Sequence, residues 1–166
     1  LDTSYSFSFG SNPKHDAMMR SLLVQRSKIL EAVESNRTFR EIADQVAEDC
    51  GALGYEGVHE KHPGRVIGHR AVRVRGPQGF RLRGSDGASL GWFLAKEALA
   101  RHLPRQSPLW NRSAASDHAP TEGLWLVEPH FAGDGFGAKW EEILVIEKGH
   151  ARWLEEEPPH VREWAC

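Results

Sequence analysis

Apolar and polar residues alternate along the first ten positions of the chain. Tyr5, Phe7 and Phe9 are separated from one another by single serines, which is the two-residue period of a strand with one buried face. The alternation stops at Gly10. We therefore predict a half-buried strand that ends at Gly10.

Two helical patterns follow this strand. A polar residue stands before Pro13, which is typical of a helix start, and apolar residues then recur every three or four positions to about residue 34. Thr38 and Glu41 have the spacing of a capping box, and the apolar stripe after them stops at Gly54. The sequence therefore predicts two helices in succession.

Strand-like patterns dominate the second half of the chain. Residues 55–90 are rich in Gly, Pro, His and Arg and contain only short strand-like pieces. Residues 92–103 have the pattern of a short amphipathic helix, and 104–121 is typical of an exposed loop. Three longer strands are expected at residues 123–131, 139–146 and 151–154, the last after a Lys-Gly turn. The predicted fold class is α+β, a curved and mostly antiparallel sheet covered by helices.

Length and composition are those of one folded domain. The chain has 166 residues, of which 40% are apolar and 27% charged, so we treat residues 1–166 as one domain. Its apolar runs are shorter than the roughly 20 residues of a membrane helix. The net charge of −2 comes from well-mixed acids and bases, which argues against nucleic acid and membrane as partners.

The two cysteines indicate a reducing setting. Cys50 and Cys166 form no CxxC pair, so neither a disulfide framework nor a thiolate metal site is indicated, and a cytoplasmic location fits best. The chain opens with Leu1 and has no charged-then-apolar leader. Because strand-like alternation begins at once, we expect further sequence upstream of Leu1.

Three short segments place potential metal ligands in apolar strand context. They are Ile67-Gly68-His69, Leu126-Val127-Glu128-Pro129-His130 and Lys139-Trp140-Glu141-Glu142-Ile143-Leu144-Val145. An ionised carboxylate inside a core is costly unless it has an ion pair, hydrogen bonds or a metal. Because side chains alternate along a strand, Glu141 and Glu142 are expected to face opposite sides. Only one of them can enter a given site.

The order of these elements resembles the catalytic domain of the metal-dependent peptidases that include methionine aminopeptidases, Xaa-Pro aminopeptidases and prolidases. The final segment is the most specific, because Gly137, Lys139, Glu141 and the Lys148-Gly149 turn match in order. The resemblance implies the pita-bread fold, with a site in the concavity of the sheet. It also implies two divalent metal ions, for which the ligand types suit Mn, Co, Fe or Zn, bound by two Asp, one His and two Glu.

The resemblance assigns four of these five ligands. Asp2 takes the position of the family's second Asp, and His69 that of its ligand His. Glu128 matches the first Glu, which would also relay a proton during attack on the peptide carbonyl, and Glu141 matches the second. Each of these residues taken singly is more often structural. Their joint occurrence in family order favours the metal site.

The departures from the family concern one ligand and the substrate-stabilising histidines. The family's first Asp lies upstream of Asp2 and is absent here, so we expect these 166 residues to be nearly inactive alone. Arg65 stands where the family usually has another His, and its later His-Glu pair has no match in residues 73–80. His118 is the candidate catalytic imidazole, with His62 as an alternative, although a solvent-exposed loop His is the more common interpretation of both.

Three functions are open at this point. The first is a dinuclear metallopeptidase with a peptide substrate, nearer to the Xaa-Pro branch than to the methionine branch. The second is a binding module that has kept the fold and lost catalysis, and the third is a creatinase-type metallohydrolase of a small amidine or amide. Arginines between positions 65 and 83 are able to bind a substrate carboxylate, but a solvated charged loop is favoured. The predicted domain is also compatible with a homodimer as its oligomeric state.

Overall fold

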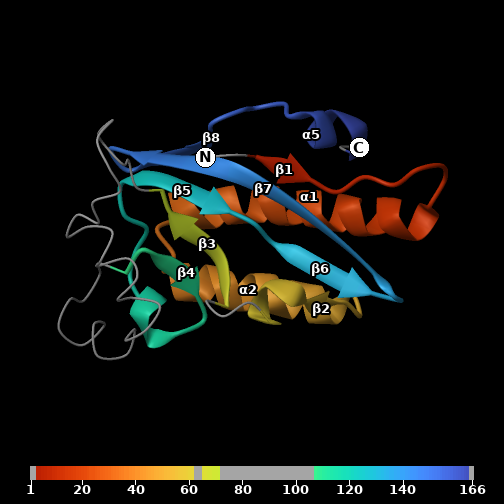
Figure 1. The fold of residues 1–166 in the computed structure, drawn as a ribbon. Helices are drawn as coiled ribbons and strands as arrows, with labels where there is room; N and C mark the ends of the chain where they lie inside the picture. Colours follow the sequence, from red (N-terminus) through yellow and green to blue (C-terminus); the bar gives the residue numbers. More distant parts are fainter. Residues whose placement is uncertain (1–2, 62–64, 72–106, 165–166) are drawn as a thin grey trace, which may run out of the picture.

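The computed structural model describes residues 3–61, 65–71 and 107–164. Helices, strands and short 3-10 turns alternate along this part of the chain (Figure 1). In order they are β1 (Ser4–Tyr5), α1 (Pro13–Glu34), α2 (Phe39–Ala52), β2 (Glu56–Gly57), η1 (Val58–Lys61), β3 (Val66–Arg70), β4 (Leu109–Asn111), η2 (Ala114–Ser116), β5 (Gly123–Val127), β6 (His130–Gly133), β7 (Phe136–Glu147), β8 (His150–Trp153) and α5 (Pro159–Trp164).

The strands form one sheet centred on β7. Its strand order is β2-β6-β7-β5-β3-β4, and β1 and β8 also pair with β7. Every pairing between the described strands is antiparallel. β7 has 12 residues, so one edge of it pairs with β6 and then β5, and the other edge with β1 and then β8. The expected antiparallel sheet with covering helices is therefore present.

Helices α1 and α2 lie against one face of this sheet (Figure 1). The indole of Trp140 in β7 donates a hydrogen bond to the carbonyl of Leu22 in α1 at 2.9 Å. Apolar side chains from both layers form the core between them, among them Met18, Ile29, Phe39, Val46, Trp125, Val127, Trp140 and Leu144. Since side chains alternate along a strand, the residues between these core positions face away from the helices.

Both predicted helices are confirmed, and their ends have local causes. The side chain of Asn12 accepts a hydrogen bond from the His15 amide at 3.1 Å, just before Pro13. Thr38 and Glu41 form the expected capping box, with reciprocal bonds of 2.7 and 3.2 Å. None of the helices in the described ranges is long and apolar enough to cross a membrane.

The predicted N-terminal strand is wrong beyond its first residues. β1 covers only Ser4–Tyr5, and the ladder with β7 ends where the Ser6 amide donates to the Lys139 carbonyl at 2.9 Å. Phe7 and Phe9 are 62% and 95% exposed. Their alternation does not reflect a buried face: both rings lie beyond the residues of β1 that pair with β7, and they contact each other.

The later strands differ from the prediction at two points. The expected strand at 123–131 is divided into β5 and β6, because Pro129 has no N–H with which to continue the ladder. β4 lies inside the predicted loop, whereas the predicted helix at 92–103 falls outside the described residues. The β7–β8 hairpin is confirmed, with Lys148 and Gly149 at φ values of 54° and 80°, as a tight hairpin turn requires.

Candidate functional site

The face of the sheet opposite α1 and α2 carries the candidate ligands His69 of β3, Glu141 of β7 and Glu128, which directly follows β5. Leu126 pairs with His69 on one side and with Ile143 on the other, and directly paired residues share a face. Glu141 lies two residues before Ile143 in β7 and therefore points to the same side. We refer to this side as the open face.

Glu128 and Glu141 converge on the ammonium group of Lys139. Nζ of Lys139 lies 3.1 Å from Oε2 of Glu141 and 3.5 Å from Oε2 of Glu128. Ser4, which pairs with Glu141 across β1 and β7, donates a hydrogen bond from Oγ to the same Glu141 oxygen at 3.2 Å. One cation thus holds, at one point of the open face, two carboxylates that lie 13 positions apart in sequence.

The electrostatics of this cluster favour a charged lysine beside a neutral imidazole. Burial lowers the pKa of Lys139, but the hydrogen bonds and charges of Glu141 and Glu128 outweigh burial and raise it above its ordinary value. His130 pairs with Lys139 across β6 and β7. Burial lowers the pKa of His130, the Lys139 charge lowers it further, and Glu128 opposes both. His130 is therefore neutral at neutral pH.

The packing of β3 against β5 explains why the Gly-His segment has a glycine at position 68. A Cβ at Gly68 would lie 2.6 Å from the carbonyl oxygen of Leu126 and 3.3 Å from the ring of Trp110. A larger residue would therefore separate β3 from β5. This close approach lets the Glu128 amide donate to the Ile67 carbonyl at 2.7 Å, which extends the ladder to the candidate ligand.

These residues fit a divalent ion in part. Glu128 and Glu141 offer converging oxygen donors, which hard divalent ions prefer, and His69 lies partly exposed on the same face. Within residues 3–61, 65–71 and 107–164, no group of three or more His, Cys, Asp or Glu side chains is placed to hold a metal ion. The candidates Asp2 and His62 lie outside the described residues.

His118 lies on the helix side of the sheet. Its side chain is buried, its Nδ1 is 2.9 Å from the carbonyl oxygen of Ala119, and its ring centroid is 5.5 Å from that of the core residue Phe39. The interpretation of His118 as a solvent-exposed loop residue is therefore wrong. The structure does not bring His118 to Glu128 and Glu141.

Glu142 also faces the helices, as the alternation predicts. Its Oε1 accepts a hydrogen bond from Nε of Arg26 at 2.8 Å and lies 2.9 Å from Nε2 of His160. Only Glu141 of the two adjacent acids enters the open face. Glu142 is a structural anchor between β7, α1 and α5.

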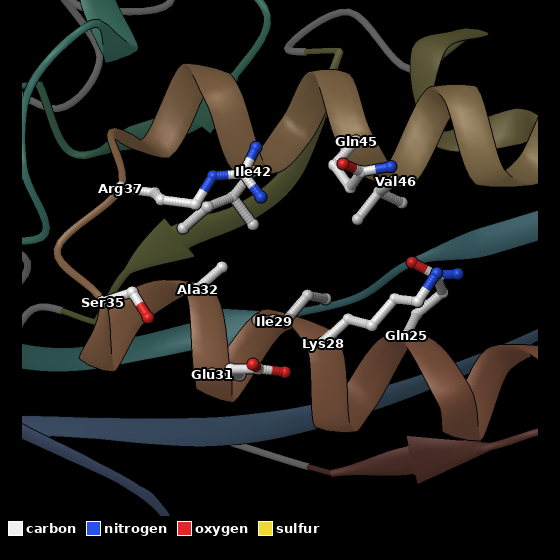
Figure 2. Close-up of a pocket in the computed structure, with 10 residues that line it drawn as sticks. All are labelled: Gln25, Lys28, Ile29, Glu31, Ala32, Ser35, Arg37, Ile42, Gln45 and Val46. Atoms are coloured by element: carbon white, nitrogen blue, oxygen red, sulfur yellow. The ribbon is translucent and has the colours of Figure 1, made fainter.

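Two cavities lie near these elements. One, of about 180 Å³, adjoins the candidate site and is lined by Tyr5, Glu141 and Pro158 among others. The other, of about 260 Å³, lies between α1 and α2 on the helix layer and is shown in Figure 2. The second cavity is separate from the open face.

Comparison with known proteins shows the fold. No family model and no curated protein matches the sequence. The structure is similar to the crystal structure of a dipeptidase from Pyrococcus horikoshii OT3, with a TM-score of 0.56 and 14% sequence identity. The match covers 90% of this chain and 33% of that chain, so this chain spans about a third of the length of its neighbour. The similarity at this identity concerns the fold alone.

The sequence prediction assigned no role in the site to three members of the cluster. Lys139 stands two positions before Glu141, which places both on one face of a strand, and this spacing was a usable signal. Ser4 and His130 join through strand pairing with β7. Their register depends on contacts between distant segments and leaves no local pattern.

Proposed function

We propose that this chain forms part of a metal-dependent hydrolase of N-terminal peptide bonds, of the Xaa-Pro aminopeptidase or dipeptidase type, with the pita-bread fold. The observation that supports it is the convergence of Glu128 and Glu141 on one cation at the open face. The likeness to a dipeptidase fold is consistent with it. The proposed substrate is a peptide, and the proposed metal ligands are Asp2, His69, Glu128 and Glu141.

The residues of the chain have distinct proposed tasks. A divalent ion held by the proposed ligands, such as Mn, Co, Fe or Zn, would lower the pKa of bound water and so make a hydroxide available at neutral pH. Ser4 fixes the orientation of the Glu141 carboxylate through its hydrogen bond. Glu128, whose side chain is 28% exposed, is accessible to water and accepts the proton released during attack on the peptide carbonyl.

Metal binding is the first test. We would titrate Mn²⁺ into the protein and follow free and bound metal by electron paramagnetic resonance, in the wild type, Glu128→Gln and Glu141→Gln. Each substitution removes one anionic donor, so affinity should fall at least about tenfold. Glu147→Gln is the matched control, because Glu147 is an exposed residue of the same strand and face whose partner is Lys148. Equal affinity in all four proteins would contradict the proposed ligands.

Peptide hydrolysis is the second test. Residues 1–166 alone should be nearly inactive, because one of the five family ligands is absent from them. A longer protein that supplies this Asp should cleave Xaa-Pro dipeptides and tripeptides only with added Mn²⁺ or Co²⁺, and Glu128→Gln or His69→Ala should abolish that cleavage. Metal binding by the longer protein without cleavage of any peptide would contradict the peptidase assignment. Cleavage of small amidines or amides in its place would favour the creatinase-type reaction.

Lys139 supports a second candidate, a binding module without catalysis. Its ammonium already neutralises the two carboxylates on which a metal would depend. A wild type that binds no Mn²⁺, together with a Lys139→Met variant that does, would favour this candidate over the peptidase.

A further inference from the structure

A cleft runs between α1 and α2 on the side of the helix layer, away from the open face (Figure 2). Its volume is about 260 Å³, close to the lower end of small-molecule pockets. The floor is apolar and is formed by Ile29 and Ala32 of α1 and by Ile42 and Val46 of α2. Polar side chains stand at the two ends of this floor.

Arg37 marks one end of the cleft. Figure 2 shows its side chain extending from the connection between the helices over Ile42. Within the part of the chain that the structure describes, its guanidinium makes one weak hydrogen bond, to the Glu41 carbonyl at 3.4 Å, and has no carboxylate partner. Glu31 also lines the cleft, but its carboxylate is turned away from Arg37 (Figure 2). This end offers an uncompensated positive charge.

Gln25 marks the other end. It is 2% exposed, and its Nε2 donates to Oδ2 of Asp49 at 3.0 Å. That bond fixes the amide orientation, because an oxygen in the same place would face the carboxylate. Oε1 then has no partner among the described residues, although a buried acceptor normally has one. This end requires a hydrogen-bond donor.

The charge of this second end limits which donor fits. Nζ of Lys28 lies nearby, 2.7 Å from the same Asp49 oxygen that receives the Gln25 amide. Because the Lys28 ammonium already pairs with Asp49, this end has no spare carboxylate among the described residues to compensate a ligand ammonium, whereas a hydroxyl or an amide N–H needs no such compensation. The donor that meets Gln25 is therefore neutral.

We propose that this cleft binds a small carboxylic acid that has an apolar body and a neutral hydroxyl or amide N–H at its far end. The carboxylate pairs with Arg37, the body covers the apolar floor, and the far donor satisfies Oε1 of Gln25. The site is independent of the proposed metal centre, because it lies on the helix layer and shares none of its residues.

Isothermal titration with three related compounds tests the assignment. Hydroxyphenylpropanoate carries the acid, the apolar ring and the donor, hydroxyphenylpropanamide lacks the charge, and phenylpropanoate lacks the donor. The first should bind most tightly. Loss of the charge should weaken binding at least about tenfold, and loss of the donor by about fivefold, as expected for charged and neutral hydrogen bonds.

Two substitutions test whether Arg37 and Gln25 bind the two ends of the ligand. Arg37→Gln should erase the preference for the acid over its amide, and Gln25→Leu should erase the preference for the hydroxylated ring, effects that a loss of stability alone would not produce. Arg20→Gln is the control, because Arg20 is an exposed α1 residue outside the cleft, and it should leave all three affinities unchanged. Absence of binding to folded wild-type protein, or an acid preference that persists in Arg37→Gln, would overturn the proposal.

Discussion

Glu141 and Glu142 are neighbours in β7, but their carboxylates lie on opposite faces of the sheet. Oε2 of Glu141 is 3.1 Å from Nζ of Lys139 on the open face, whereas Oε1 of Glu142 is 2.8 Å from Nε of Arg26 in α1. One strand thus contributes a candidate metal ligand to one face and an anchor for the helix layer to the other. Substitutions at the two positions should have different consequences.

Glu142→Ala should destabilise the fold strongly. The carboxylate is almost fully buried, and its removal leaves Arg26 and His160 without their shared partner. The loss of one member of a buried ion pair costs about 3–5 kcal/mol. Urea denaturation measures the change, with exposed Glu147→Ala as the control at about 0.5 kcal/mol or less. Similar stability of the two variants would show that the buried pair is not an anchor.

Lys139→Met should have opposite effects on stability and on metal binding. Without the ammonium, the carboxylates of Glu128 and Glu141 repel each other, which should lower stability in metal-free buffer by about 1 kcal/mol for a partly exposed pair. The same change removes a cation that competes for both carboxylates, so the affinity for Mn²⁺ should rise.

The two effects are measured by thermal unfolding with and without Mn²⁺. Lys148→Met is the control, since the Lys148 side chain is 84% exposed and its ammonium pairs with the exposed Glu147. A Lys139→Met variant that Mn²⁺ does not stabilise more than the wild type would indicate that the two carboxylates are not a cation site.

Asp49 should make the stability depend on pH in the acid range. Burial raises the pKa of Asp49, but hydrogen bonds from Lys28, Gln25 and Gln45 outweigh burial and lower it below its ordinary value. A carboxylate with a lowered pKa in the folded state stabilises the fold above its unfolded pKa of about 3.9, and this contribution is lost as the pH falls through the folded pKa.

Asp49→Asn tests this contribution. The free energy of unfolding should fall less in the variant than in the wild type when the pH is lowered from about 5 to about 3. Glu157→Gln, a substitution of an exposed acid, serves as the control and should follow the wild type. Parallel pH profiles of Asp49→Asn and wild type would contradict the assigned pKa shift.

The parts of the fold that depend on local chemistry were predictable from the sequence. The capping box of Thr38 and Glu41 joins residues three positions apart, and the turn at Lys148 and Gly149 depends on its own backbone conformation. The alternation at Phe7 failed because a strand also needs a partner, and β7 pairs with β1 only at Ser4 and Tyr5. The sequence around Phe7 does not indicate where this pairing ends.

The candidate site was likewise predictable only where it depends on the local alternation of side chains. Alternation alone separates Glu141 from Glu142. The approach of Glu128 to Lys139 depends on the register of β5, β6 and β7, and the burial of His118 depends on its packing against Phe39. These are contacts between segments that are distant in sequence, so residue type and spacing could not specify them.

Gly68→Ala should disturb both the fold and the candidate site. The added Cβ would lie 2.6 Å from the backbone oxygen of Leu126, and a backbone atom in a central pairing cannot move as a flexible side chain can. β3 must then shift away from β5, at a cost of about 1–3 kcal/mol for an overpacked core position. Because His69 follows directly in β3, the shift should also weaken any binding of Mn²⁺ at the open face.

Gly51→Ala is the matched control for this substitution. Gly51 lies in α2, and a Cβ there meets nothing within 4 Å, so alanine should stabilise the helix by up to about 1 kcal/mol. Urea denaturation should therefore move the two variants in opposite directions from the wild type. If Gly68→Ala were as stable as the wild type, the glycine before His69 would not be required for the packing of β3 on β5, and a role in the candidate site would be the better explanation of the Gly-His segment.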